Sequence, residues 1–302
     1  MISCKNEWGK LKKVVVGTIK GARWPLSDHQ FQQELKTSLW TETTICDANI
    51  PEYIIEETEE DLSVLVDVLK RFDVEVLRPC PADYSVHQGM YSYCPRDRII
   101  IAGDVAVDVN MSISLRNHEI DFLLPLLGTV QILTMPRFPD TFMDAANVCR
   151  LNDSWLFLES KSGSKKAYNW LCDTFPNIRI ELCNFYAGVH IDSTISAVND
   201  HTVLVNGSRV TKKNLPQTLR DWDIIWVDDC VAQDFYHYPY ASKWMGMNTF
   251  SINPTTLVVD RNQTDLIRKL ERKNFTVIPL ILRHTRTLGG GFHCVTLDLV
   301  RE

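Results

Sequence analysis

The sequence lacks several features that would assign it to a large class of proteins. Its 302 residues carry 32 basic and 38 acidic side chains, a net charge of −6, and no block rich in Lys and Arg. This charge argues against general binding to nucleic acid. The longest apolar runs, such as Phe122 to Leu127 and Val277 to Leu282, are too short to span a bilayer. We therefore expect small molecules as partners, with no nucleic acid and no membrane.

Signals for export, for nucleotide binding and for a disulfide framework are also missing. The N-terminal residues hold no apolar core of signal-peptide length, which predicts a cytoplasmic location. Neither a G-x-G-x-x-G nor a P-loop pattern is present, so the chain lacks the phosphate cradle of a nucleotide-binding fold. The nine cysteines are an odd number without C-x-x-C spacing. We expect most of them to be reduced and buried.

A zinc site is the alternative to consider for any chain that is rich in His and Cys. His293 and Cys294 are adjacent, and His284 stands close by in the sequence. Neighbouring residues of a strand point to opposite faces, so His293 and Cys294 are poorly placed to share one ion. We expect no metal and no cofactor.

What the sequence does contain is a helix followed by a short β-branched strand, a pairing that recurs five times. The expected helices are Glu60 to Phe72, Arg116 to Leu127, Lys165 to Phe175, Leu215 to Trp222 and Thr264 to Lys273. The strands after them are Val74 to Leu77, Val130 to Leu133, Ile178 to Leu182, Ile224 to Val227 and Val277 to Leu282. Five similar units favour an α/β ring with approximate five-fold symmetry. A doubly wound sheet is the alternative that this alternation also allows.

A glycine triplet near the C-terminus delivers a single cysteine. Gly289, Gly290 and Gly291 let the backbone approach a ligand or adopt a positive φ, and Cys294 follows at the start of a strand-like run. A cysteine attacks through its thiolate, so it needs a base or a positive charge nearby and an electrophilic target. Cys294 is therefore a candidate nucleophile.

Several polar side chains lie in the loops after the repeating strands, where a ring brings loops together: Asp144, His190, Ser242 and Cys294. Asp192 follows His190, and Asp97 directly precedes the apolar strand Arg98 to Ala102. Each has a structural interpretation when it is considered alone: Asp97 as a turn residue and Asp144 as a helix N-cap. His190 and Asp192 alternate like strand residues that point to one side, though alone they are a core histidine and a surface group. Together with Cys294 they suit a planar cation, because carboxylates accept the forked donors of a guanidinium in pairs.

Segments in the same order along the chain resemble the amidinotransferases of the glycine amidinotransferase and inosamine-phosphate amidinotransferase type. These enzymes belong to the guanidine-modifying superfamily with the pentein fold. The matching segments are Asn6-Glu7-Trp8, Pro95-Arg96-Asp97, Asp144-Ala145-Ala146, His190-Ile191-Asp192, Ser242-Lys243-Trp244 with Met247-Asn248, and Leu288 to Cys294. The resemblance implies an α/β fold, a five-bladed propeller of pseudo-five-fold symmetric ββαβ units, with residues 1–302 as a single catalytic domain.

The resemblance also implies a reaction. Cys294 would be the nucleophile, His190 the general acid and base, and Asp144 the partner that orients His190. The amidino group of L-arginine would pass through an amidino-cysteine to a primary amine, and ornithine would leave first. Glycine is the default acceptor on family counts, with guanidinoacetate as product.

The same resemblance assigns the binding residues. Asp97 and Asp192 would hold the guanidinium, and Arg209 with Ser242 would meet the amino-acid carboxylate. Without the resemblance, Arg209 is a solvated surface arginine. A homodimer is expected only because dimers are common among symmetric assemblies and among such relatives.

Departures from the family pattern leave the acceptor and the outcome open. Tyr186-Ala187-Gly188-Val189 stands where the glycine-using enzymes resemble Asn-Pro-Met, and Asn147 replaces the second acid of an Asp-Ala-Ala-Asp pattern. The short span between Asp97 and Asp144 would trim the rim and admit a larger acceptor. Two alternatives remain at this stage. One is an arginine hydrolase or deiminase with the same Cys and His, where water exclusion decides the product. The other is a non-catalytic guanidine-binding protein.

Overall fold

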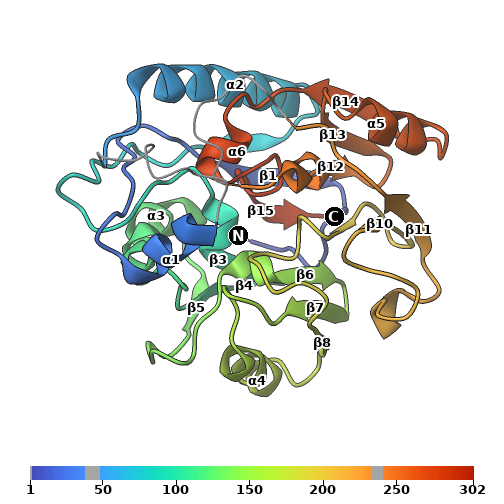
Figure 1. The fold of residues 1–302 in the computed structure, drawn as a ribbon, viewed down its shortest axis with the longest axis horizontal. Helices are drawn as coiled ribbons and strands as arrows, with labels where there is room; N and C mark the ends of the chain where they lie inside the picture. The colour runs from blue at the N-terminus through green and yellow to red at the C-terminus, as the bar shows by residue number, and fades with distance from the viewer. Residues whose placement is uncertain (1, 38–47, 233–240) are drawn as a thin grey trace.

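The computed structural model describes residues 2–37, 48–232 and 241–302, and the structural findings concern these residues. Its helices are α1 (His29–Thr37), α2 (Glu52–Arg71), α3 (Leu124–Leu127), α4 (Lys165–Thr174), α5 (Thr264–Glu271) and α6 (Thr285–Leu288). The 3₁₀ segments are η1 (Pro95–Asp97), η2 (Ser114–Phe122), η3 (Ala145–Asn147), η4 (Gln217–Leu219) and η5 (Lys243–Met247). Figure 1 shows them around the strands.

The strands form five sheets of three strands each. They are β1 (Leu11–Val16), β2 (Glu75–Leu77), β3 (Ile99–Ala102), β4 (Val105–Asp108), β5 (Gln131–Thr134), β6 (Val148–Leu151), β7 (Ser154–Leu158), β8 (Arg179–Cys183), β9 (Ile195–Ala197), β10 (Thr202–Asn206), β11 (Asp223–Val227), β12 (Phe250–Asn253), β13 (Thr256–Asp260), β14 (Thr276–Leu280) and β15 (Thr296–Arg301). In each sheet the middle strand pairs antiparallel with one neighbour and parallel with the other.

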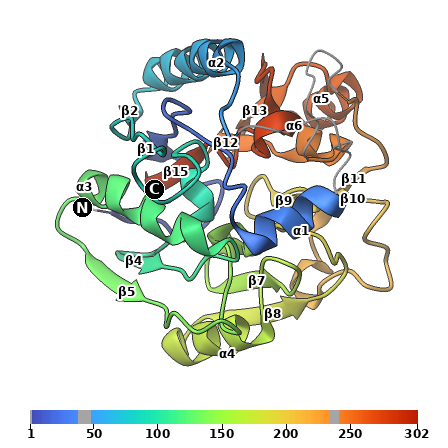
Figure 2. The same cartoon turned by 60° about the vertical axis from the view of Figure 1, so that its left-hand side comes forward.

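Each sheet is one ββαβ unit, because a parallel partner requires a crossover connection. In the unit of β6, β7 and β8, for example, the hairpin partner of β7 is β6, and the chain reaches β8 through α4. The strand contributed by the hairpin is buried in every unit, whereas the parallel strand is partly exposed. The hairpin strands therefore line the inside of the ring and the parallel strands the outside (Figures 1 and 2).

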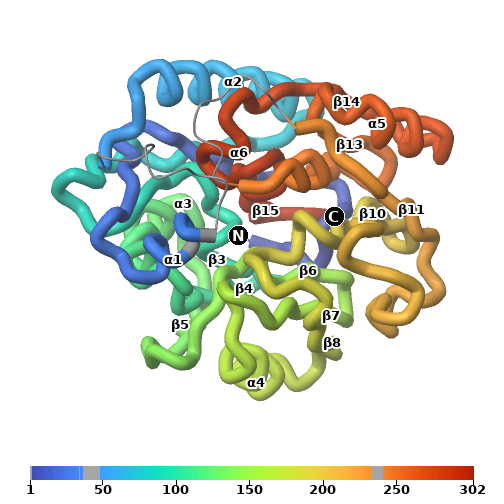
Figure 3. Tube along the Cα trace, in the orientation of Figure 1, coloured from blue at the N-terminus to red at the C-terminus, as the bar shows by residue number. Residues whose placement is uncertain are grey.

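The two ends of the chain close the ring in a single sheet. β15 pairs antiparallel with β1 and places Val14 opposite Asp298, while β2 adds to the other edge of β1. Figure 3 shows this C-terminal strand beside the N-terminal one near the middle of the molecule. The residues just before β15 are thereby brought to the centre of the ring, where loops from the other units meet.

The centre of the ring holds charges rather than apolar side chains. Arg150 Nε lies 2.9 Å from Glu7 Oε1, and Arg96 Nη2 lies 2.6 Å from Asp298 Oδ1. Arg301 Nε is 2.8 Å from the other Asp298 oxygen. All five side chains are buried. The apolar core is divided into five clusters around this centre. The buried ion pairs therefore connect segments of the chain that belong to different apolar clusters.

All five predicted strands of the helix-strand pairs are present, but three of the helices differ from expectation. The segment Leu215 to Trp222 forms only the 3₁₀ turn η4, and Arg116 to Leu127 is divided between η2 and α3. Pro125 explains why Arg116 to Leu127 is not one helix, since a proline inside an α-helix removes a hydrogen bond and clashes with the preceding turn. Pro216 stands at the N-cap of η4 and does not account for the short turn there. The expected helix from Glu60 begins earlier, as α2 at Glu52.

Two further sequence predictions can be compared with the described residues. The eight cysteines among them are free; six of these are buried, Cys172 is half-buried and Cys80 is exposed. Cys94 and Cys294 lie beside each other, and Cys46 lies outside the described residues. None of the described helices is both long enough and apolar enough to cross a membrane.

Candidate active site

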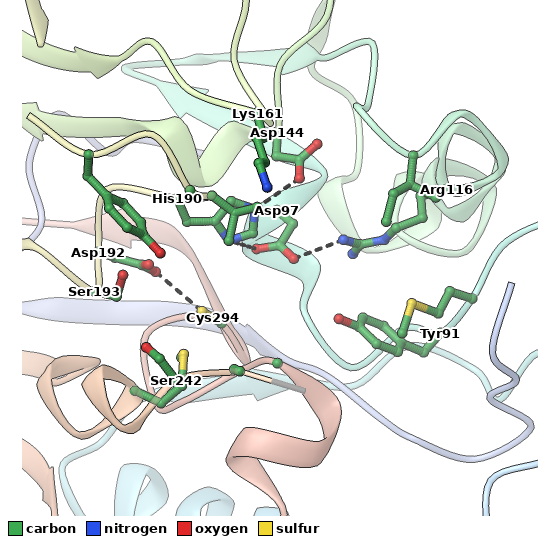
Figure 4. Close-up of a pocket in the computed structure, with 18 residues that line it drawn as sticks. Tyr91, Asp97, Arg116, Asp144, Lys161, His190, Asp192, Ser193, Ser242 and Cys294 are labelled. Carbon is green, nitrogen blue, oxygen red and sulfur yellow. Dashed lines mark hydrogen bonds and ion pairs between the residues drawn. The ribbon is translucent and has the colours of Figure 1, made fainter. Parts of the chain in front are cut away.

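A single cavity of about 370 Å³ gathers most of the residues singled out in the sequence (Figure 4). Those that line it are Asp97, Asp144, His190, Asp192, Ser242 and Cys294. They come from η1, from the residues before η3, β9, η5 and β15, and hence from loops of different units. The predicted convergence of these side chains is therefore observed.

Cys294 is positioned by the glycine triplet. Gly289 ends α6 with φ of +73°, a conformation that favours glycine. A Cβ on Gly290 would lie 2.4 Å from Cys94 Sγ and 3.3 Å from Cys294 Cβ, so this position has no room for a side chain. Cys294 itself lies in a turn two residues before β15, and its backbone N–H donates to Asn248 Oδ1 at 3.0 Å. The triplet thus lets the chain pass close to the sulfur.

The sulfur of Cys294 lies at the buried end of the cavity. Its thiol donates to Asp192 Oδ2 at 3.3 Å, and only 1% of the residue is exposed. A hydrogen bond with the Cys94 thiol, burial and the charge of Asp192 together raise the pKa of Cys294 well above the ordinary value. The raised pKa favours the protonated thiol at neutral pH, and a bound cation would favour the thiolate by offsetting the negative charge.

His190 and Asp144 form a hydrogen-bonded pair in the cavity wall. His190 Nε2 lies 2.9 Å from Asp144 Oδ2, and Nδ1 lies 3.8 Å from Asp97 Oδ1. Burial by itself would lower the pKa of His190, but the carboxylates of Asp97 and Asp144 outweigh it and raise the pKa well above its ordinary value. The imidazole is thus held as a proton donor, as a general acid requires.

The strand predicted for residues 190 to 192 is wrong. His190, Ile191 and Asp192 lie in a turn before β9, and His190 has a positive φ of +28°. The N–H groups of Thr194 and Ile195 both donate to the carbonyl of Ile191, which closes a turn instead of a ladder. His190 and Asp192 nevertheless both line the cavity. The strained backbone at His190 is of the kind found at functional sites.

Asp97 and Asp192 supply carboxylate oxygens to the cavity. Asp97 Oδ2 accepts from Arg116 Nη1 at 3.0 Å, while its Oδ1 is buried without a hydrogen-bond partner among the described residues. Asp192 Oδ2 lies 2.9 Å from His293 Nδ1. Burial would raise the pKa of Asp192, but the hydrogen bond with His293 outweighs it and the pKa is about 2. Asp192 is therefore ionised and can accept from a cation.

Ser242 lines the cavity, whereas Arg209 does not appear among the described lining residues. Arg209 Nη1 donates to Ser193 Oγ at 3.0 Å and to Thr194 Oγ1 at 2.8 Å. Its Cζ lies 3.6 Å from the centroid of the Tyr186 ring. Since Ser193 and Tyr186 line the cavity, Arg209 lies behind this part of the wall and is not a free surface arginine.

Sequence analysis missed two residues of the site. Arg116, inside a predicted helix, lines the cavity and holds Asp97. His293, considered only as a metal ligand, connects Asp192 to the charged centre, because its Nε2 lies 3.2 Å from Glu7 Oε2. A buried arginine leaves no local signal in the sequence. The described residues include no cluster of His, Cys, Asp and Glu that could hold a metal ion.

Comparison with known proteins finds relatives over the whole chain, although no family model matches it. Inosamine-phosphate amidinotransferase 1 of Streptomyces griseus is 36% identical, over 100% of this chain and 97% of the relative. Mitochondrial glycine amidinotransferase of Xenopus tropicalis is 23% identical, over 98% and 82%. The solved inosamine-phosphate amidinotransferase of S. griseus superposes with a TM-score of 0.92 at 35% identity, covering 100% of this chain and 97% of that one. A dimethylarginine dimethylaminohydrolase shares the fold alone, with a TM-score of 0.69 and 13% identity over 95% and 99%.

Proposed function

The chain belongs to the amidinotransferase family, and its five ββαβ units are the pentein fold; from its site we propose that it moves the amidino group of L-arginine, through Cys294, to a primary amine. The observation that carries this proposal is the set of side chains in one cavity. A buried sulfur lies beside an ionised carboxylate, and a histidine in the same wall is paired with a second carboxylate.

Asp97 and Asp192 would hold the guanidinium of the donor. Asp97 Oδ1 is a buried acceptor with no hydrogen-bond partner among the described residues, although it lies 3.8 Å from His190 Nδ1. Asp192 is ionised beside the sulfur. A guanidinium offers planar, paired donors to such oxygens, which would fix its plane relative to Cys294. Its positive charge would also lower the free energy of the thiolate, which the Asp192 carboxylate disfavours.

The first half-reaction is an attack by Cys294 on the guanidinium carbon. As arginine binds, the thiol of Cys294 loses its proton to solvent. A bond then forms between the thiolate Sγ and this carbon, and His190 gives its own proton to the side-chain nitrogen as the bond from carbon to that nitrogen breaks. Ornithine leaves, and the amidino group stays on the sulfur. Asp144 would keep His190 oriented, since its Oδ1 is itself fixed by Ser112 at 2.9 Å.

The second half-reaction reverses these roles. A primary amine takes the place of ornithine, His190 removes a proton from it, and the nitrogen attacks the amidino carbon. The bond from sulfur to carbon breaks and the thiol is regenerated. If water attacked instead, arginine would be hydrolysed, so the proposal requires that the amine is much the better acceptor.

The acceptor is the least determined part of the function. Glycine, the default on family counts, is not confirmed. Three relatives at 32 to 36% identity are named as inosamine-phosphate amidinotransferases, one of them as putative, whereas four glycine amidinotransferases lie at 22 to 24%. Gly188 and Val189 line the cavity in the segment that departs from the glycine-using pattern. We propose an acceptor larger than glycine, with inosamine phosphate as the first to test.

The remaining binding residues, the domain organisation and the homodimer are proposed from the resemblance to the family. Ser242, on the wall, and Arg209, behind it, would bind the amino-acid carboxylate of arginine after a modest shift of Tyr186. We infer that residues 1–302 act as one catalytic domain, because the relatives match over the full chain. The cytoplasmic location and the homodimer stay predictions, and gel filtration with light scattering would test the second.

The experiment is product analysis with arginine and a panel of amines. Purified protein is incubated with L-arginine alone, and with glycine, lysine or inosamine phosphate added, and amidinated products are identified by mass spectrometry. The proposal predicts an amidinated acceptor with matching ornithine, and at most one ornithine per protein without an acceptor. Sustained release of citrulline or urea from arginine alone would instead indicate a hydrolase.

A further inference from the structure

Two buried polar atoms of cavity-lining residues have no hydrogen-bond partner in the described part of the chain. They are Asp97 Oδ1 and Arg116 Nη2. The donor guanidinium would satisfy the Asp97 oxygen, which is an acceptor. It cannot satisfy Arg116, because a guanidinium carries only donors. A buried donor without an acceptor costs free energy, so the Nη2 atom of this cavity-lining residue requires a separate explanation.

The guanidinium of Arg116 is fixed in place by its other nitrogens. Its Nε lies 3.1 Å from both carboxylate oxygens of Glu119, and Nη1 donates to Asp97 at 3.0 Å. The Cζ atom is 4.9 Å from the centroid of the Tyr91 ring, and the residue is only 3% exposed. Figure 4 shows the guanidinium pointing into the cavity between Asp97 and Tyr91. The Nη2 atom therefore offers its N–H groups from a rigid position.

The charges around Arg116 decide which kind of oxygen these N–H groups can bind. One positive charge already faces two carboxylates, Asp97 and Glu119. A phosphate or carboxylate placed here would be a third negative group in a buried position, and repulsion from the two would oppose it. A hydroxyl oxygen accepts the hydrogen bond without adding charge. An uncharged oxygen is thus favoured over an anion.

The donor substrate has no such oxygen. Arginine carries a guanidinium, an amine and a carboxylate, so of the two substrates only the acceptor can supply an uncharged hydroxyl. We propose that Arg116 Nη2 donates a hydrogen bond to a hydroxyl of the acceptor amine while the amidino group is on Cys294. This inference rests on the proposed function, and it makes Arg116 a residue that determines which amines are used.

The surroundings of Arg116 fit the carbon skeleton of such an acceptor. Met90, Tyr91 and Ile113 line the same part of the cavity and are apolar. The hydroxyl of Tyr91 already donates to the carbonyl of Leu288 at 3.1 Å, so the ring presents only its apolar body. A hydroxylated ring or chain would place carbon atoms against these side chains and its hydroxyl toward Arg116.

The test is a cycle of two substitutions, one in the protein and one in the acceptor. Cyclohexylamine is compared with 2-, 3- and 4-aminocyclohexanol, at saturating arginine, in the wild type and in Arg116→Lys, which keeps the charge but loses the fork of donors. We expect the wild type to prefer at least one aminocyclohexanol by about tenfold or more in kcat/KM, and Arg116→Lys to lower this preference to below about threefold. Arg137→Lys, outside the described cavity lining, should leave the preference unchanged.

A purely structural role for Arg116 would slow all four amines alike and leave their ratios unchanged, which would overturn the inference. A wild-type preference for the aminocyclohexanols below about threefold would also overturn the inference. This wild-type comparison is sufficient on its own if Arg116→Lys does not fold. A preference for 3-aminocyclohexanecarboxylate over every aminocyclohexanol would overturn the choice of an uncharged oxygen. Failure of the wild type to form an adduct with arginine alone would overturn the proposed function instead, so the two failures are distinguishable.

Discussion

His190 Nε2 lies 2.9 Å from Asp144 Oδ2, and this carboxylate is fixed in turn by Ser112, whose N–H and hydroxyl both donate to Asp144 Oδ1 at 2.9 and 3.0 Å. The hydrogen bond fixes the plane of the imidazole. With Asp97 it also raises the pKa of His190 against the effect of burial. The acidity and the orientation of the proposed general acid therefore depend on Asp144.

Replacing Asp144 by Asn should separate this effect from folding. An amide keeps the shape of the side chain but loses the charge that holds the proton on His190, so kcat should fall by about 100-fold to 10,000-fold. This kcat is measured as the steady-state rate of ornithine release in the presence of an acceptor. Asp104→Asn changes an exposed turn residue and should be neutral. Near-normal turnover in Asp144→Asn would exclude the assigned role.

The thiol of Cys294 should react slowly in the empty site at neutral pH. Its pKa is raised by the hydrogen bond with Cys94, by burial and by Asp192. The thiolate fraction, and with it the rate of alkylation by iodoacetamide, should keep rising about tenfold per pH unit from about pH 7 to about pH 9. Peptide mapping separates Cys294 from the exposed Cys80. A plateau below about pH 8 would show that the pKa is lowered instead.

His293 should act on the binding of arginine more than on the chemical step. Its ring lies between Asp192 and Glu7, so His293→Leu removes the group that holds the Asp192 carboxylate. We expect KM for arginine to rise about tenfold or more, and His293→Asn, which keeps a donor close to the position of Nδ1, to recover much of the loss. His118→Leu changes an exposed histidine and serves as control. Equal KM values in all four proteins would contradict this.

The charged centre should be sensitive to the loss of one partner. Asp298 is fully buried and pairs with Arg96, Arg150 and Arg301. Asp298→Asn leaves positive charges without a counter-ion and should lower the free energy of unfolding by about 3–5 kcal/mol, measured by urea denaturation. Asp140→Asn, at the exposed pair with Lys166, should change little. Equal stability of the two variants would rule out an important role for the buried pairs.

The parts of the fold that the sequence predicts are those with a local cause. Helix α4, expected from Lys165 to Phe175, is observed at Lys165–Thr174, because its apolar spacing and the N-cap at Ser164 are both local. The inner strands β6 and β12 escape prediction, since Arg150 and Ser251 interrupt their apolar pattern. Arg150 lies in an inner strand because it pairs with Glu7 and Asp298 at the charged centre of the ring, which no local pattern shows.

In the candidate site, too, the residues that the sequence predicts are those with a local signal or a family resemblance. Cys294 is signalled by three glycines beside it, and the resemblance brings in His190, Asp144 and the binding aspartates. Arg116 has no such signal, because its importance comes from contacts with Asp97 and Glu119 that only the folded chain creates. The backbone at His190, predicted as extended, is a turn with positive φ, since its strain depends on neighbours distant in sequence.

The most direct test of the account is the mass of the protein after it has been mixed with L-arginine alone and quenched in acid. The account predicts an increase of about 42 Da, located on Cys294 by peptide mapping, together with about one equivalent of ornithine. The adduct should be absent in Cys294→Ser and should disappear when an acceptor amine is added. An unmodified Cys294 during active turnover, under a quench that preserves a synthetic amidino-cysteine, would contradict it.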